Sequence, residues 1–295
     1  MTPVKKITQL VILAAILFCG LFAKAQQKFA PFPVMQQNWR YEYKPFQLVG
    51  NLYYVGTYDL ACYLITTPQG HILINTGLTE ETPMLIKHIT DLGFKVADIK
   101  ILLTTHGHYD HVAGMAEIKA LTKAKVMVNE YDAPVVEDGG KSDYAFGERG
   151  ATFEAVKVDV RLKDGEVVKL GGMELKALHH PGHTKGATGF LFDVKDKDKT
   201  YKVFIANMPT VLDQTNLNNM PTYPNVAKDY AMTFERMKAV QFDLWLASHA
   251  AQFNLHAKRK PDDAYNPEVY RDRAGYDAAI TRFYNLYLRK LNSGK

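Results

Sequence analysis

The segment 104–114 concentrates side chains that could do chemistry. Its sequence, TTHGHYDHVAG, places His106, His108, Asp110 and His111 within six positions of a chain that has ten histidines in all. Imidazole and carboxylate groups together are suitable ligands for zinc or a similar divalent cation. Separate surface histidines are the alternative explanation, and so dense a cluster disfavours it. The segment therefore predicts a metal site.

The sequence on either side of the cluster predicts how the four side chains converge. The apolar run 99–103 is typical of a short strand, and residues 112–123 predict a helix. In a continuous strand or a continuous helix, one of the four side chains would point away from the others. In a strand-to-helix turn all four can meet, and we expect Gly107 to permit the tight backbone there. Loops at strand ends are also where such folds usually carry functional residues.

Two further histidines follow predicted strands. His183 lies in the turn Pro-Gly-His-Thr after the strand 173–178, and His249 follows the apolar run 244–247. A catalytic zinc has three protein ligands and one open position, so six donors suit two metal ions. A secreted zinc-binding protein without activity is the alternative, but such a protein would need closed ligand shells. Two sets of three donors with open positions favour catalysis.

The remaining elements form two similar halves. In the first half, strand-like runs precede a helix with Thr82 as N-cap, Pro83 at its first position and Gly93 at its end. In the second half, Gly171-Gly172 indicates a hairpin. Two mixed halves with helices outside predict a three- or four-layer α/β sandwich. The other expected elements are strands 52–55, 61–66, 71–75 and 126–128, hairpins 166–170/173–178 and 190–194/201–205, and helices 232–240 and from 267 onwards.

The first 25 residues predict a secretory signal peptide. Lys5 and Lys6 precede the apolar run 10–22, and Ala23-Lys24-Ala25 is typical of a cleavage site. The run is too short for a permanent membrane span, so we expect no stable membrane insertion after cleavage. Cys19 leaves a lipoprotein as an alternative, which the bulky residues before it disfavour. Residues 26–295 then form a single domain in the periplasm.

Charge and cysteine content narrow the function classes. Three of the 36 basic residues lie in the leader, so 33 basic side chains face 31 acidic ones in the mature chain. This small excess predicts neither nucleic acid nor an anionic membrane as a partner. Cys62 is the only cysteine left, so no intrachain disulfide can form. We expect a monomer that acts on a small molecule.

The His-x-His-x-Asp-His motif, the Pro-Gly-His-Thr turn and the last strand-end histidine resemble the metallo-β-lactamase superfamily. The resemblance covers essentially the whole of residues 26–295. It implies an αββα sandwich, in which two mixed sheets carry helices on their outer faces and the metals lie at one rim. It also implies two zinc ions per chain, the first held by His106, His108 and His183 and the second by Asp110, His111 and His249.

The resemblance is narrower than the superfamily. Thioesterases of the glyoxalase-II kind and lactonases carry an additional Asp that bridges both metals, but here Asn207 and Met208 stand in its place and Asp213 lies too far along. Two subclasses of zinc β-lactamases place a Cys on the second metal, and none is present after Cys62. The chain therefore resembles the third subclass of class B. Within it, GGKSDY, HHPGHTKG, IANMP and ASHAAQF look like the GOB-type enzymes, although these tend to have Gln at the position of His106.

The resemblance implies zinc-dependent hydrolysis of the β-lactam amide bond of penicillins, cephalosporins and carbapenems by a metal-bound hydroxide, and hence antibiotic resistance. A lactonase or a glyoxalase-II-like thioesterase remains the enzymatic alternative. We expect Asp110 to be catalytic, because it would orient the hydroxide as well as bind the second metal. Four residues are expected near the substrate. They are Thr210 as a partner of its carboxylate, Met208 beside the second metal, and Tyr144 and Phe146 in segment 139–153, interpreted as either a mobile flap or an ordinary surface loop.

Overall fold

The computed structural model describes residue 29 and residues 36–294 of the 295-residue chain. The predicted signal peptide, residues 1–25, lies outside the described residues, so its cleavage stays a prediction. Within the described part, no helix combines the length and apolar character needed to cross a membrane.

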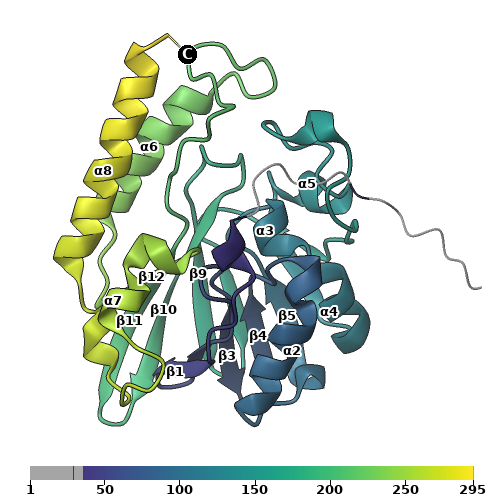
Figure 1. The fold of residues 1–295 in the computed structure, drawn as a ribbon, viewed down its shortest axis with the longest axis vertical. Helices are drawn as coiled ribbons and strands as arrows, with labels where there is room; N and C mark the ends of the chain where they lie inside the picture. Colours follow the sequence, from purple (N-terminus) through teal and green to yellow (C-terminus); the bar gives the residue numbers. More distant parts are fainter. Residues whose placement is uncertain (1–28, 30–35, 295) are drawn as a thin grey trace, which may run out of the picture.

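Two mixed β-sheets lie face to face in the middle of the molecule (Figure 1). The first sheet has the strand order β1-β2-β3-β4-β5-β6-β7. Its pairs are antiparallel from β1 to β4 and parallel from β4 to β7. The strands are β1 (Phe46–Val49), β2 (Leu52–Tyr54), β3 (Tyr63–Thr67), β4 (Gly70–Ile74), β5 (Ile99–Leu103), β6 (Lys125–Asn129) and β7 (Val160–Leu162).

The second sheet contains both predicted hairpins. Its strand order is β12-β11-β10-β9-β8, and only the β11–β12 pair is parallel. The parallel pair brings the end of β12 beside the end of β11, which places their following loops at one edge. The strands are β8 (Val167–Leu170), β9 (Met173–His179), β10 (Thr188–Asp196), β11 (Lys199–Ala206) and β12 (Leu244–Ala247).

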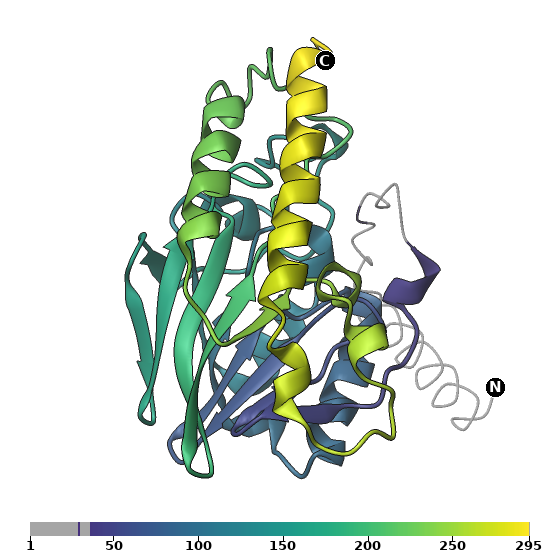
Figure 2. The ribbon, with the colours of Figure 1, turned by 90° about the vertical axis from the view of Figure 1, so that its left-hand side faces the viewer.

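Helices cover both outer faces of the paired sheets. Helices α2 and α4 cover the first sheet, and α6 and α8 lie side by side over the second (Figures 1 and 2). The predicted αββα sandwich is therefore confirmed. The helices are α2 (Thr82–Asp91), α3 (Tyr109–Val112), α4 (Met115–Thr122), α5 (Ala133–Glu137), α6 (Val226–Ala239), α7 (Leu255–Lys258) and α8 (Arg273–Asn292), with short 3-10 helices at Gln37–Trp39, Thr79–Glu81, Val96–Asp98, Gly147–Arg149, Ala250–Phe253 and Pro267–Tyr270.

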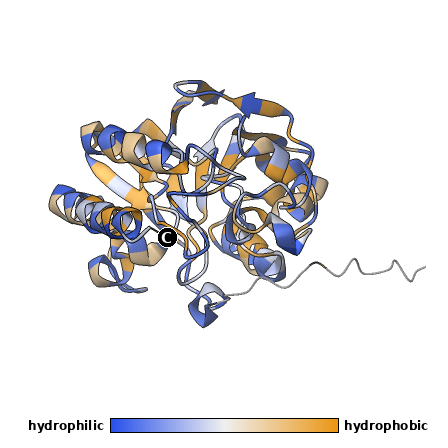
Figure 3. Ribbon diagram, turned by 90° about the horizontal axis from the view of Figure 1, so that it is seen from above, coloured by the Kyte–Doolittle hydropathy of each residue, from blue (hydrophilic) through white to orange (hydrophobic). Residues whose placement is uncertain are grey.

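The sheets are buried on both faces, as apolar strand sequences require. In β4, Ile72 and Ile74 belong to the apolar cluster between the sheets, whereas Leu73 belongs to the cluster beneath α2 and α4. Successive side chains of a strand point to opposite faces, so one apolar run serves two cores. Figure 3 shows the same arrangement, with hydrophobic strands inside and hydrophilic outer helix faces.

Three helices differ from the sequence expectation. The predicted helix 112–123 is broken between α3 and α4 at Gly114, where a Cβ atom would lie 2.7 Å from the Thr76 carbonyl oxygen. The helix expected from Pro267 is a 3-10 turn, and α8 begins only at Arg273, because the Asp272 side chain caps it by accepting from Gly275 N. Helix α6 begins at Val226, six residues before the predicted start, because Val226 and Tyr230 are buried against the second sheet.

Candidate active site

The six predicted ligands meet at one rim of the two sheets. His106 follows β5, His183 lies in the turn between β9 and β10, and His249 follows β12. Main-chain hydrogen bonds join these strand ends, since Thr188 N donates to the Thr105 carbonyl and Ala61 N to the Ser248 carbonyl. The rim is thus assembled by backbone pairing between segments far apart in sequence.

The first triad consists of three buried histidines. One ring nitrogen of each of His106, His108 and His183 lies within 4.8 Å of the others, and the ring centroids are 4.6–4.8 Å apart. Burial lowers the pKa of His106 well below its ordinary value and that of His183 to about 3. Both rings are therefore neutral at pH 7, as metal ligands must be.

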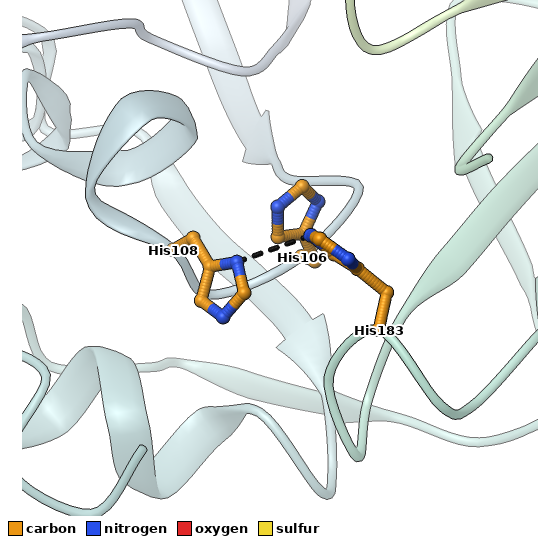
Figure 4. A group of neighbouring side chains, drawn as sticks. All are labelled: His106, His108 and His183. Atoms are coloured by element: carbon orange, nitrogen blue, oxygen red, sulfur yellow. Dashed lines mark hydrogen bonds between the residues drawn. The ribbon is translucent and has the colours of Figure 1, made fainter. Parts of the chain in front are cut away.

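The outer partners of His108 and His183 indicate that a cation fits between them. Asp143 Oδ2 lies 3.2 Å from His108 Nε2, and the Thr210 carbonyl oxygen accepts from His183 Nδ1 at 2.8 Å. These acceptors favour a proton on the outer nitrogen of each ring, so the inner nitrogens present lone pairs to each other at 3.2 Å (Figure 4). Tetrahedral zinc with bonds of about 2.0–2.1 Å separates its nitrogens by about 3.3 Å. The donor set and its spacing therefore fit zinc.

The second triad lies against the first. Asp110 Oδ2 is 3.1 Å from His111 Nε2 and 3.3 Å from His249 Nε2. His106 belongs geometrically to both sets, because its ligand nitrogen also lies within 4.8 Å of those of Asp110 and His111. His111 is buried, its Nδ1 atom has no hydrogen-bond partner among the described residues, and its Nε2 atom makes only the ion-pair contact with Asp110. A buried ring nitrogen that lacks a hydrogen-bond partner is typical of a metal ligand.

Charges within the second triad shift the pKa values in opposite directions. Burial alone would raise the pKa of Asp110, but His111 and His249 outweigh it and hold that pKa well below its ordinary value. Burial alone would lower the pKa of His249, but Asp110 and Asp59 raise it to about 9. Asp110 is therefore a carboxylate, an anionic ligand, at every physiological pH.

Three buried aspartates support the triads, and the sequence analysis assigned none of them. Asp143 lies against His108, and Asp59 Oδ2 lies 3.0 Å from His249 Nδ1. Asp132 accepts from Gly107 N, Gly186 N and the Thr184 hydroxyl, and so ties together the loops that carry both parts of the first triad. A carboxylate behind a ligating histidine orients the ring and increases its basicity. The only sequence signal was Asp143 within GGKSDY, a segment noted for its resemblance and not for this contact.

Gly107 has a different role from the one expected. Its φ is not in the left-handed region, and an added Cβ atom would approach Val135 only to 3.4 Å. Its main-chain N–H donates to Asp132 at 2.8 Å. The turn is therefore held by this hydrogen bond, not by the conformational freedom of glycine.

An open cleft of about 450 Å³ leads to both triads. Its size is suitable for a small-molecule substrate. Five of the six predicted ligands line the cleft, all except His111, together with the expected Thr210 and Phe146. The wall also includes residues that the sequence analysis missed, namely Gln36, Trp39, Asp59, Val211, Leu212, Asp213, Gln214, Ala251 and Gln252.

The four expected substrate contacts divide into two pairs. Thr210 and Phe146 line the cleft, and the Thr210 hydroxyl lies 2.9 Å from His183 Nδ1. Met208 and Tyr144 do not line it, which corrects their expected placement. Met208 is 1% exposed within the core, and the Tyr144 hydroxyl donates to the Gly182 carbonyl. Through this hydrogen bond Tyr144 anchors segment 139–153 to the turn that carries His183.

Comparisons with known proteins agree with this geometry. A family model described as the metallo-β-lactamase superfamily matches residues 57–195. A β-lactamase from Chitinophaga pinensis is 54% identical, with a TM-score of 0.87 over 88% of this chain and 98% of that one. The class B3 di-zinc metallo-β-lactamase LRA-12 from an Alaskan soil metagenome is 50% identical, with a TM-score of 0.87 over 90% of this chain and 100% of that one. The metallo-β-lactamase GOB-18 from Elizabethkingia meningoseptica is 47% identical, with a TM-score of 0.88 over 90% and 99%.

A curated relative is more distant. A hydroxyacylglutathione hydrolase from Rhodopseudomonas palustris is 33% identical over 130 residues, which are 44% of this chain. The chain spans only 42% of the length of that relative. The solved relatives, in contrast, are matched over nearly their whole length at higher identity. The chain therefore belongs to the metallo-β-lactamase superfamily, and its relatives among the solved structures include class B3 enzymes.

Proposed function

We propose that the protein is a metallo-β-lactamase that hydrolyses the amide bond of β-lactam antibiotics with two zinc ions. The observation that carries the proposal is that six donors converge beside an open cleft: the ring nitrogens of the first triad lie within 4.8 Å of one another, and Asp110 lies within 3.3 Å of His111 and His249. The likeness to a class B3 di-zinc enzyme over its whole length supports the same chemistry. Zinc ions held there would polarise a carbonyl oxygen and activate a water molecule for attack.

The chain's own residues would divide the remaining work. His106, His108 and His183 would hold the first ion, and Asp110, His111 and His249 the second. Asp110 would also accept a hydrogen bond from the attacking water, since an ionised carboxylate is a hydrogen-bond acceptor and can take up a proton. Phe146 and Thr210 lie on the cleft wall, where Phe146 offers an apolar surface and Thr210 a hydroxyl to the substrate. No serine or cysteine nucleophile is required in this reaction.

The alternative is thioester or lactone hydrolysis on the same fold. Those enzymes are expected to carry an additional Asp that bridges both metals. In this structure the residue after β11 is Asn207, whose side-chain oxygen lies 3.4 Å from the Ser248 hydroxyl. A neutral amide there cannot supply the missing carboxylate, which favours the β-lactam substrate.

Purified protein with added zinc would be assayed against a chromogenic cephalosporin, a penicillin and a carbapenem, each with and without a chelator. We expect hydrolysis that the chelator abolishes and zinc restores, and two zinc ions per chain after dialysis. Turnover of S-lactoylglutathione or an acyl-homoserine lactone, with no β-lactam hydrolysed, would refute the proposal. Full activity with a plateau at one zinc ion would refute its two-metal part.

We also propose that the mature protein is periplasmic and begins at Gln26. The basic and apolar pattern of residues 1–25 supports this location, which would place the protein between the medium and the cell-wall targets of β-lactams. Fractionation followed by N-terminal sequencing tests it. A mature chain in the cytoplasm that still begins at Met1 would contradict it.

A further inference from the structure

Asp59 is a buried carboxylate that faces three hydrogen-bond donors. It lies between β2 and β3 and is 4% exposed. Its Oδ2 atom accepts from Trp39 Nε1 at 3.2 Å and lies 3.0 Å from His249 Nδ1, while its Oδ1 atom accepts from Ala251 N at 2.9 Å. One oxygen atom is thus shared by an indole and by a predicted ligand of the second metal.

Trp39 connects this oxygen to the N-terminal part of the chain. Its indole is 7% exposed, and its ring centroid lies 5.7 Å from that of His249. Trp39 and Gln36 both line the cleft. The segment 36–39 is therefore a wall of the candidate active site, although it precedes the first strand and lies far from His249 in sequence.

We propose that Asp59 and Trp39 are positioning residues for the second metal, so that segment 36–39 helps to determine how firmly that metal is retained. This inference rests on the two-metal site proposed above. The class of ligand is unchanged: a divalent zinc ion held by Asp110, His111 and His249. The inference adds that Trp39 influences the binding of this ion through the Oδ2 atom of Asp59, which Trp39 shares with His249.

The physical reason is the choice between the two nitrogens of His249. Asp59 holds an imidazole proton on Nδ1, so Nε2, which faces Asp110 3.3 Å away, is the nitrogen left to bind the second metal once it has released its own proton. The indole N–H of Trp39 donates to the same Oδ2 atom and so holds it in that place. If the proton moved to Nε2, the ring could not bind a metal.

The first triad does not depend on this arrangement. Its outer partners are Asp143 beside His108 and the Thr210 carbonyl beside His183. The hydrogen bonds of Asp59 and Trp39 lead to His249 and Ala251 instead. A change at Asp59 should therefore affect one metal and leave the other, which a general loss of stability would not do.

The local backbone does not depend on the Asp59 side chain alone. Ala250 N donates to the Asp59 carbonyl at 2.7 Å, Ala61 N donates to the Ser248 carbonyl at 3.0 Å, and Leu60 forms a bridge with His249. We expect Asp59→Asn to fold. All three neighbours of Asp59 are donors, so the NH₂ group of the amide has no acceptor in the present arrangement. It would face either Ala251 N, or Trp39 Nε1 and His249 Nδ1. In the second case it could donate to His249 Nδ1 only if the imidazole proton moved to Nε2.

The test measures zinc affinities of the mature chain by competition with a chromophoric chelator, alongside thermal unfolding as a check of folding. For Asp59→Asn we expect about 10–100-fold weaker binding of the second zinc and unchanged binding of the first. Trp39→Phe keeps a ring against His249 but loses the indole N–H. The affinity for the second zinc should therefore fall, by a smaller factor than in Asp59→Asn. Asp193→Asn is the matched control, since it makes the same change of side chain but removes only an exposed ion pair with Lys202.

Asp143→Asn provides the complementary comparison, because it should lower the affinity for the first zinc more than the affinity for the second. The inference is overturned if Asp59→Asn and Trp39→Phe bind both zinc ions as the wild type does, or if they lose both ions equally. A wild-type chain that binds a single zinc would refute the two-metal site itself. That outcome is visible before any variant is made.

Discussion

The carboxylate of Asp132 is the structural link between the two loops of the first triad, and its replacement by an amide should be costly. It accepts from Gly107 N at 2.8 Å, from the Thr184 hydroxyl at 2.7 Å and from Gly186 N at 2.7 Å. Asp132 is 1% exposed, so water cannot replace these bonds. Gly186 approaches so closely that a Cβ atom there would lie 2.5 Å from Asp132 N.

The magnitude follows from the number of backbone donors. A carboxylate offers an oxygen to both Gly107 N–H and Gly186 N–H, but the amide of Asp132→Asn offers only one. In either orientation its NH₂ group would face a backbone N–H, whereas the Thr184 hydroxyl can rotate. An unsatisfied buried donor costs about 1–3 kcal/mol, and lost charge-assisted bonds add to this. We expect Asp132→Asn to lower the free energy of unfolding by about 2–3 kcal/mol, and Asp132→Ala by about 3–5 kcal/mol.

The assay is urea-induced unfolding of the metal-free protein, so that zinc binding does not contribute. The midpoint should fall with an unchanged m-value, and the melting temperature by about 4–12 °C for Asp132→Asn, given about 2–4 °C per kcal/mol in a domain of this size. Asp193→Asn is the control, because it removes an exposed ion pair with Lys202 that should contribute less than about 0.5 kcal/mol. If Asp132→Asn lowered the free energy of unfolding by no more than the control does, the reasoning would be refuted.

Further predictions concern the metals and the thiol of Cys62. Asp110→Asn should lose about 10²–10⁴-fold in rate even at saturating zinc, because an amide replaces neither the anionic ligand nor the proton acceptor. His106→Gln should be milder and should recover with added zinc, since Gln keeps a neutral donor; the reverse order of the two variants in kinetic assays would contradict these roles. Removal of zinc with a chelator should lower the melting temperature, and scanning calorimetry that shows no shift would exclude a structural contribution from the metals. Burial raises the pKa of Cys62 to about 12, so a thiol reagent at pH 8 should label it only after unfolding, and rapid labelling of the native protein would contradict its burial.

Most elements of the fold were predictable, because their apolar patterns are local. The apolar run of β4 and the glycine pair at 171–172 specify a strand and a hairpin without reference to the rest of the chain. The short elements β1, β7, α5 and α7 were not predicted, and the predicted helices were wrong at their ends. Gly114 interrupts a continuous helical pattern because another loop approaches its backbone, and Asp272 resets the start of α8. Such contacts involve residues distant in sequence and leave no periodic signal.

The convergence of the six predicted ligands could be predicted from their spacing and from their places after strands. Their individual roles on each metal stay predictions until metal is measured. The expected substrate contacts were less accurate. Thr210 and Phe146 line the cleft, but Met208 and Tyr144 have their side chains in the core and against the His183 turn. Sequence position identified the correct loops and could not give the direction of each side chain.

The sequence by itself determined the donor types, because zinc chemistry requires imidazoles and a carboxylate and the chain concentrates them at strand ends. Only the tertiary structure decided which carboxylates lie behind those donors. Asp59, Asp132 and Asp143 come from three separate loops, and aspartate in a loop is ordinarily a surface residue. Their contacts with His249, Gly107 and His108 exist only after both sheets have packed, since packing removes water from these buried groups and brings the carboxylates next to them.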